Sequence, residues 1–153
     1  YGLCAIISMI HDILVTTGLF SIAGLVLGWE ADALFLTALL TVIGFSVQDT
    51  IVVFDRIREN RGRLGYVTPK VINDAINQTL SRTILTSLTV FLVLIIMYVL
   101  GGQGIRVFNY VMLIGVITGT YSSIAIASPI LLGWQGLARR RLAAQVQVEK
   151  PRA

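Results

Sequence analysis

Charged residues are scarce in this chain of 153 residues: they make up 13% of it, whereas soluble domains carry about 25%. So few charges could not cover a water-soluble fold of this size, and 56% hydrophobic residues exclude a disordered chain. The single cysteine, Cys4, permits no internal disulfide and is expected to be a small buried side chain. No initiator Met and no basic signal segment stand at the start, so we interpret the chain as the C-terminal part of a longer polypeptide. The composition indicates an integral membrane protein.

Four apolar stretches are long enough to cross about 30 Å of hydrocarbon at about 1.5 Å per residue. They cover approximately residues 4–27, 33–54, 83–100 and 107–134, and residues 55–82 form a long polar connection. The sequence therefore predicts an all-α bundle of four transmembrane helices within residues 1–138, followed by a basic tail at 139–153. Pro69 favours the first turn of a helix that continues into the third span. Pro129 is expected to kink or end the fourth span.

The basic residues are distributed unevenly. Eleven of the twelve lie in or beside the middle connection or in the tail: Arg56, Arg58, Arg61, Arg63, Lys70, Arg82, Arg139, Arg140, Arg141, Lys150 and Arg152. The two short turns share only Arg106, and the first of them carries two acids. Because cytoplasmic loops of membrane proteins carry an excess of Lys and Arg, the connection, the tail and the N-terminus are predicted to be cytoplasmic.

Small residues recur at helical spacing in two spans. The fourth span has Gly115, Gly119, Ser123 and Ala127 at every fourth position, and the first has Gly24 and Gly28. Helices in lipid approach closely at such stripes, so these residues are predicted to pack against neighbouring helices. The same stripes could also border a polar path.

Three charged residues stand inside or at the edge of the spans: Asp12, Asp49 and Arg82. Asp49 lies about 8 Å inside the cytoplasmic end of its span at 1.5 Å per residue, and Arg82 opens the next span. Counting along the helices therefore places Asp12, Asp49 and Arg82 in one layer of the membrane.

Two interpretations of this layer remain open. Burial disfavours an ionised carboxylate and a nearby cation favours it, so movement of Arg82 relative to Asp49 would switch the acid between holding and releasing a proton. The alternative is a static Asp49–Arg82 ion pair that pins two helices, with Asp12 held in a fixed hydrogen bond. His11 is adjacent to Asp12 in the chain, so the two are predicted to point in different directions and not to pair.

A second group of charges lies just outside the membrane. Asp55, Arg56 and Arg58 follow the second span with alternating charge, and Arg139, Arg140 and Arg141 form a basic run in the tail. They are expected either to anchor the helix ends at the membrane surface, where anionic lipids attract them, or to dock a cytoplasmic partner.

Four motifs resemble the SecF family of bacterial protein-export membrane proteins. They are VQDTIVVFDRIREN at 47–60, QTLSRTILTS at 78–87, GTYSSIAIASP at 119–129 and the His11–Asp12 pair. The motifs stand in the family's order and cover nearly the whole chain except the tail. Gln48 departs from the pattern, because the family usually has Asn before the aspartate; both are amides.

The resemblance implies the last four of six helices in one half of a transporter of the resistance–nodulation–division (RND) superfamily. The first helix, the extracytoplasmic domain and the second helix would then precede Tyr1, in a separate SecF or in a fused SecD–SecF. It further implies a location in the bacterial inner membrane, with SecD, the SecYEG channel and the translocating preprotein as partners. Protons are the implied coupling ion, with Asp49 and Arg82 in their path and no other cofactor.

Other functions are weighed against this one. A structural subunit that stabilises the translocon would need the same bundle without proton conduction. Two membrane aspartates could form a protease dyad, although the flanking glycines expected for it are missing around Asp49. A drug-efflux transporter of the same superfamily is a further alternative. The sequence has no evident metal-binding cluster, phosphate-binding glycine loop or nucleophile triad, so we expect a transport role rather than catalysis.

Overall fold

The computed structural model describes residues 1–62 and 66–148. They form the helices α1 (Gly2–Leu27), α2 (Ala33–Arg61), α3 (Pro69–Leu100), α4 (Arg106–Ala125) and α5 (Ala127–Val148), with the short 3₁₀ helix η2 (Gln103–Ile105) before α4. Four segments are long and apolar enough to span a membrane: α1, α2, α3 and the stretch from η2 into α5, residues 103–141. The predicted four-span, all-α architecture is confirmed.

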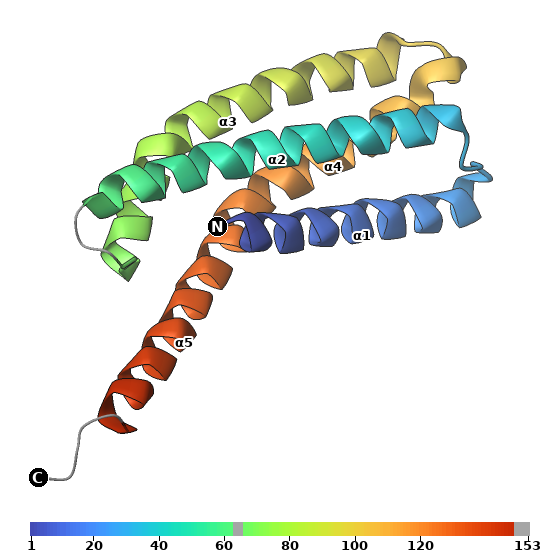
Figure 1. The fold of residues 1–153 in the computed structure, drawn as a ribbon. Helices are drawn as coiled ribbons and strands as arrows, with labels where there is room; N and C mark the ends of the chain where they lie inside the picture. Colours follow the sequence, from blue (N-terminus) through green and yellow to red (C-terminus); the bar gives the residue numbers. More distant parts are fainter. Residues whose placement is uncertain (63–65, 149–153) are drawn as a thin grey trace, which may run out of the picture.

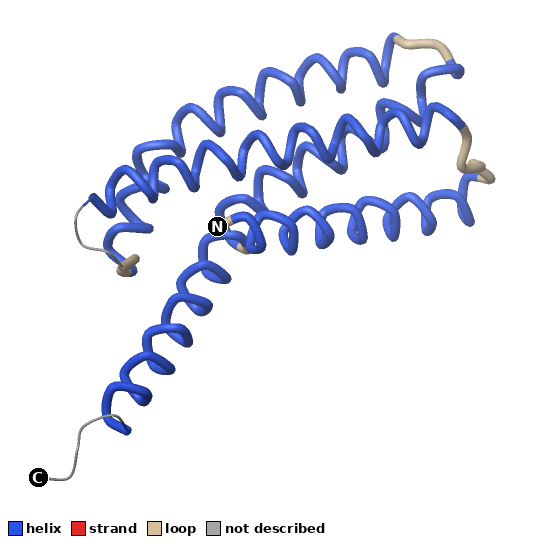
Figure 2. The backbone as a smooth tube through the Cα atoms, in the orientation of Figure 1, coloured by secondary structure: helices blue, strands red, loops and turns tan. Residues whose placement is uncertain are grey.

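Helices α1 to α4 lie side by side in alternating directions, and α2 packs along α4 in the middle (Figure 1). We call the end with the α1–α2 and α3–α4 turns the hairpin end and the end with the α2–α3 connection the loop end. Figure 2 shows that the described chain is helical except at these connections, at its first residue and at the break between α4 and α5. At the loop end α5 leaves the bundle at an angle.

Local signals in the sequence explain where the helices begin. The Asp32 carboxylate accepts a hydrogen bond from the backbone N–H of Phe35 at 2.9 Å and caps α2. Thr68 caps α3 in the same way, and Pro69 occupies the first helical position, as predicted.

Two clusters of buried side chains hold the bundle together. One lies toward the hairpin end and contains Phe20, Phe35, Ala38, Val42, Leu94, Val111, Met112 and Val116. The other lies toward the loop end, where α1, α2, α3 and α5 meet, and contains Cys4, Val53, Phe54, Ile57, Val67, Val71, Ile72, Ala75, Ala127 and Leu131. Cys4 is buried there, as expected.

The helices extend further than the apolar runs. α2 continues to Arg61 and α3 starts at Pro69, so most of the polar connection predicted at 55–82 is helical. The fourth span is interrupted at Ile126 and resumes as α5, with Pro129 in the first turn of α5. α5 then runs without a break through the predicted boundary at 138/139 to Val148, while residues 149–153 of the predicted tail lie outside the described residues.

Candidate functional site

Asp49 lies in the loop-end half of α2, half-buried between α3 and α4. The Ser123 hydroxyl of α4 donates a hydrogen bond to Asp49 Oδ2 at 3.1 Å. On the side of α3 the carboxylate faces a cavity of about 270 Å³. The cavity is lined by Phe45, Gln48, Asp49, Val52, Arg82, Thr83, Thr86 and Val90. The lining of the cavity therefore combines polar and apolar side chains, and the cavity opens at the surface between α2 and α3.

Arg82 lines the same cavity from α3 and is exposed. The structure thus brings together Asp49 and Arg82, which are 33 positions apart in the sequence. Within residues 1–62 and 66–148 the ion pairs are His11–Asp12 and Arg56–Glu59, so Asp49 and Arg82 share a cavity without forming a salt bridge. A guanidinium that is not paired with the carboxylate can move relative to it, whereas a static ion pair would hold the two groups together.

Asp12 belongs to α1, and its side chain faces α2 and is 1% exposed. Ser46 of α2 donates a hydrogen bond to Asp12 Oδ2, and His11 Nδ1 lies 3.2 Å from Asp12 Oδ1. The prediction that His11 and Asp12 would not pair is therefore wrong. Adjacent residues diverge around a helix, but the imidazole is long enough to fold back to the neighbouring carboxylate.

Three hydrogen-bonded pairs of polar side chains connect α1, α2 and α4, and Asp12 and Asp49 each belong to one of them. Ser46–Asp12 joins α2 to α1, Ser123–Asp49 joins α4 to α2, and Ser8–Ser122 joins α1 to α4 at 2.6 Å. We call these six residues, two from each helix, the polar ring. Five of its members are at most 1% exposed, and Asp49 alone opens onto the cavity. Each carboxylate accepts a hydrogen bond from a different serine, whereas the two acids of a protease dyad share one proton.

Sequence reasoning identified the acids but missed Ser8, Ser46 and Ser122. A signal was present, because Ser8, Asp12 and Thr16 recur at every fourth position of α1 and all three are buried. A polar stripe of this kind marks the helix face that turns toward protein rather than lipid.

The small residues of α4 allow this close packing. A Cβ atom on Gly115 would lie 2.1 Å from Val42 Cγ2, and one on Gly119 would lie 3.4 Å from Ser46 Cβ. Ser123 and Ala127 continue the stripe and are fully buried.

The two glycines predicted to pack in α1 behave differently. A Cβ on Gly24 would meet the backbone oxygen of Trp29 at 2.9 Å, so Gly24 lies against the following turn. Gly28 is exposed, has nothing within 4 Å of its Cβ position and ends α1 with φ of 70°. The position needs glycine for the left-handed C-cap of α1, and the packing predicted for Gly28 stays a prediction.

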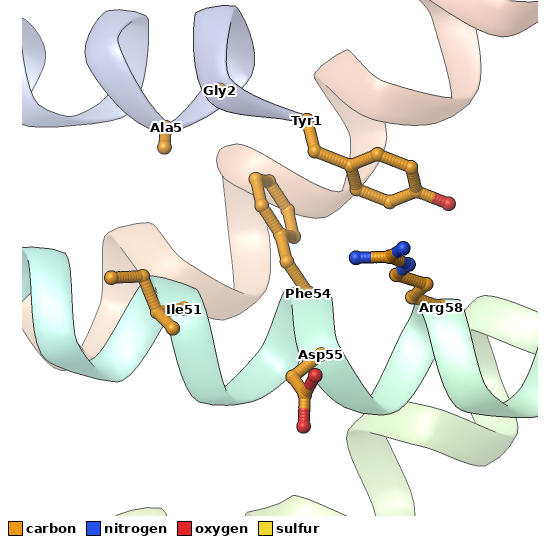
Figure 3. A pocket seen from close by; sticks show the side chains of 7 residues that line it. All are labelled: Tyr1, Gly2, Ala5, Ile51, Phe54, Asp55 and Arg58. Carbon is orange, nitrogen blue, oxygen red and sulfur yellow. The ribbon is translucent and has the colours of Figure 1, made fainter.

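The charged groups at the loop end have separate surroundings. Arg56 donates to Glu59 and to Gln78 of α3, each at 2.6 Å, and so links α2 to α3. Asp55 and Arg58 are exposed and line a pocket of about 230 Å³ with Tyr1 (Figure 3). In that view the Asp55 carboxylate points away from α1, whereas Arg58 lies beside the Tyr1 ring.

The basic run of the tail begins on α5. The Arg139 guanidinium lies 4.7 Å from the centre of the Tyr66 ring, and Arg140 and Arg141 are exposed. Arg63, Lys150 and Arg152 of the predicted cytoplasmic charge lie outside the described residues.

Comparisons with known proteins agree with the motifs. Residues 1–136 match the family described as "Protein export membrane protein SecD/SecF, C-terminal". The chain is 54% identical over 136 residues to the protein translocase subunit SecF of Thermobaculum terrenum, covering 88% of this chain and 43% of that protein. It is 46% identical to the Synechocystis protein of the same name, with the same coverage of both chains.

Solved structures give the same assignment. A crystal structure of SecDF in a super-membrane-facing form has a TM-score of 0.84 and 38% identity, covering 94% of this chain and 19% of the other. SecDF from Thermus thermophilus, described as a translocon-associated membrane protein, has a TM-score of 0.79 and 39% identity, covering 89% of this chain and 18% of the other. This chain thus spans less than half the length of these relatives. On its matched sequence and fold, the chain belongs to the SecD/SecF family of protein-export membrane proteins.

Proposed function

We propose that this chain is the membrane portion of a Sec protein-export subunit that uses proton flow to assist the translocation of secreted proteins. The observation that carries the proposal is the position of Asp49. This acid lies in an apolar bundle and faces a cavity that Arg82 also lines without forming a salt bridge to it. Ionisable side chains within a membrane are costly and typically mark ion or proton pathways. The relatives named protein translocase subunit SecF supply the export context.

The proposed mechanism uses the freedom of Arg82. Water entering the cavity delivers a proton to Asp49, and the neutral acid no longer attracts the guanidinium. Release of the proton restores the attraction and draws α3 toward α2. A membrane potential contributes about 2.3 kcal/mol per charge per 100 mV, which can drive such a cycle in one direction. Asp12 also belongs to the polar ring, and we include it in the proton path.

The remaining parts of the proposal concern the whole protein. SecD, separate or fused upstream, the SecYEG channel and the translocating preprotein are its proposed partners, since this chain covers 43% of the Thermobaculum relative. The proposed location is the bacterial inner membrane, with the N-terminus of this chain and its C-terminus in the cytoplasm. There Arg139, Arg140 and Arg141 would meet anionic lipid headgroups.

A structural, non-conducting subunit is the second candidate. It is supported by the linking contacts themselves, because the polar ring and the Arg56–Gln78 hydrogen bond would hold the helices together without any proton movement.

The deciding experiment places Asp49→Asn in the full-length protein, reconstituted with the Sec channel in vesicles that carry a proton gradient. Proton conductance and gradient-stimulated export are recorded together. We expect both to fall while the protein still associates with the channel. Asp74→Asn is the matched control, since Asp74 is an exposed acid of α3 outside the cavity, and it should leave both unchanged.

The other outcomes decide against the proposal. If both quantities persist in Asp49→Asn, the charge is structural and the second candidate is correct. If conductance falls but export is unaffected, proton flow does not drive export. If export falls while conductance persists, Asp49 is not the site through which protons pass.

A further inference from the structure

The Ser123 hydroxyl lies between two hydrogen-bond acceptors. Its Oγ atom is 3.1 Å from Asp49 Oδ2 and 3.0 Å from the backbone carbonyl oxygen of Thr120. A serine hydroxyl has one proton and two acceptor lone pairs, so it donates fully to one partner at a time. Ser123 is completely buried and does not exchange these partners with bulk water. The two acceptors therefore compete for a single proton.

The protonation state of Asp49 decides this competition. An ionised carboxylate only accepts hydrogen bonds, and a bond to a charged acceptor is about twice as strong as a neutral one, so Ser123 then donates to Asp49. A protonated carboxyl group can also donate. Its O–H then points to Ser123 Oγ, and the serine hydroxyl rotates to the Thr120 carbonyl.

We propose that Ser123 is a positioning residue that stabilises both protonation states of Asp49 by reversing the direction of their hydrogen bond. The inference rests on the proposed function, in which Asp49 takes up and releases protons. Asp49 takes its proton from water and later releases it to water, as the proposed proton flow requires. Ser123 keeps its own proton throughout: an O–H bond of hydronium breaks as the Asp49 O–H bond forms, and the reverse happens on release.

On α4, the hydroxyl that bonds to Asp49 has a second acceptor within reach. On α3, Arg82 and the buried hydroxyl of Thr83 line the cavity in front of the carboxylate. On α1, Asp12 is bonded to Ser46 and lies beside His11. The charged residue of α4 is Arg106, at the opposite end of that helix. The group that α4 directs at the carboxylate is therefore a hydroxyl, which can serve as donor or as acceptor.

Infrared spectroscopy tests the reversal directly. Difference spectra between high and low pH are recorded on the full-length protein in lipid vesicles, and the C=O band of protonated Asp49 is identified by its loss in Asp49→Asn. In Ser123→Ala we expect that band to move to higher wavenumber, because the carboxylic acid O–H has lost its acceptor. The matched control is Ser87→Ala, which removes the 2.6 Å hydroxyl pair between Ser87 and Thr120 without touching Asp49, and should not shift the band.

The possible results separate the inference from the function on which it rests. An Asp49 band that stays in place in Ser123→Ala, or moves equally in Ser87→Ala, overturns the inference and leaves the proposed function standing. The absence of any Asp49-dependent band at every pH where the protein remains folded overturns both. If Ser123→Ala does not assemble, the spectra are recorded on Ser123→Cys, whose weaker hydrogen bonding should shift the band in the same direction.

Discussion

At the scale of single residues, Gly115 sets how closely α4 can approach α2. The Cβ position of Gly115 falls 2.1 Å from Val42 Cγ2, far inside any normal contact. One turn further along, Gly119 lies against Ser46, and the next turn brings Ser123 to Asp49. The hydrogen bond to Asp49 therefore depends on the glycines that precede Ser123 on the same face of α4.

Replacing Gly115 by alanine should lower the free energy of unfolding by about 1–3 kcal/mol, the usual cost of overpacking a well-packed interior. The measurement is unfolding by a denaturing detergent, followed by helical circular dichroism. Gly133→Ala is the matched control, because nothing lies within 4 Å of its Cβ position, and it should not lower the free energy of unfolding.

A compensating change tests the stated cause of this loss. Val42→Ala removes the two methyl groups that the new side chain would strike, so the double variant should regain much of the stability lost in Gly115→Ala. Equal stabilities of Gly115→Ala and Gly133→Ala would contradict the close packing of α2 and α4.

The acids were predictable at this scale, but their partners were not. Counting 1.5 Å per residue from the ends of the apolar runs placed Asp49 and Arg82 at one depth, and they do line one cavity. Which serine faces which acid depends on how α1, α2 and α4 are rotated about their axes. That rotation is set by contacts such as Gly115 with Val42, which a sequence pattern does not specify.

At the scale of elements, the sequence predicted where each helix lies, but several helices extend beyond the predicted ends of the spans. Apolar runs report where a helix crosses hydrocarbon, but helix hydrogen bonds continue into water. The residues of α2 from Asp55 to Arg61 are therefore helical, although they are polar. Arg56, Glu59 and Gln78 stabilise this extension by linking it to α3.

The start of α2 depends on a single capping side chain. Asp32→Ala removes the acceptor for the Phe35 N–H and should lower the free energy of unfolding by about 1 kcal/mol. Glu30→Ala changes an equally acidic, exposed residue of the same turn that does not begin a helix, and it should have little effect. The two detergent-unfolding curves are compared directly, and a loss of the same size in both variants would mean that turn charge, rather than capping, matters.

At the scale of the whole molecule, the two ends of the bundle differ in charge. The turn between α1 and α2 carries Glu30 and Asp32, whereas the loop end carries Arg56, Arg58 and the basic run of α5. Because basic loops remain on the cytoplasmic side during insertion, this asymmetry predicts that the loop end is cytoplasmic. The proposed proton cycle depends on that orientation, since it fixes which end of the bundle meets the higher proton concentration.

Single cysteines in the full-length protein test the orientation. Cys4 is first replaced by alanine, and a cysteine is then introduced at Ala31 in the hairpin-end turn or at Ala138 on α5, both of which are exposed. A membrane-impermeant maleimide added to intact spheroplasts should label Ala31→Cys at once, but Ala138→Cys only after the membrane is permeabilised. The reverse pattern would place the basic end outside. The gradient would then act from the loop end, so protons would reach Asp49 from that end.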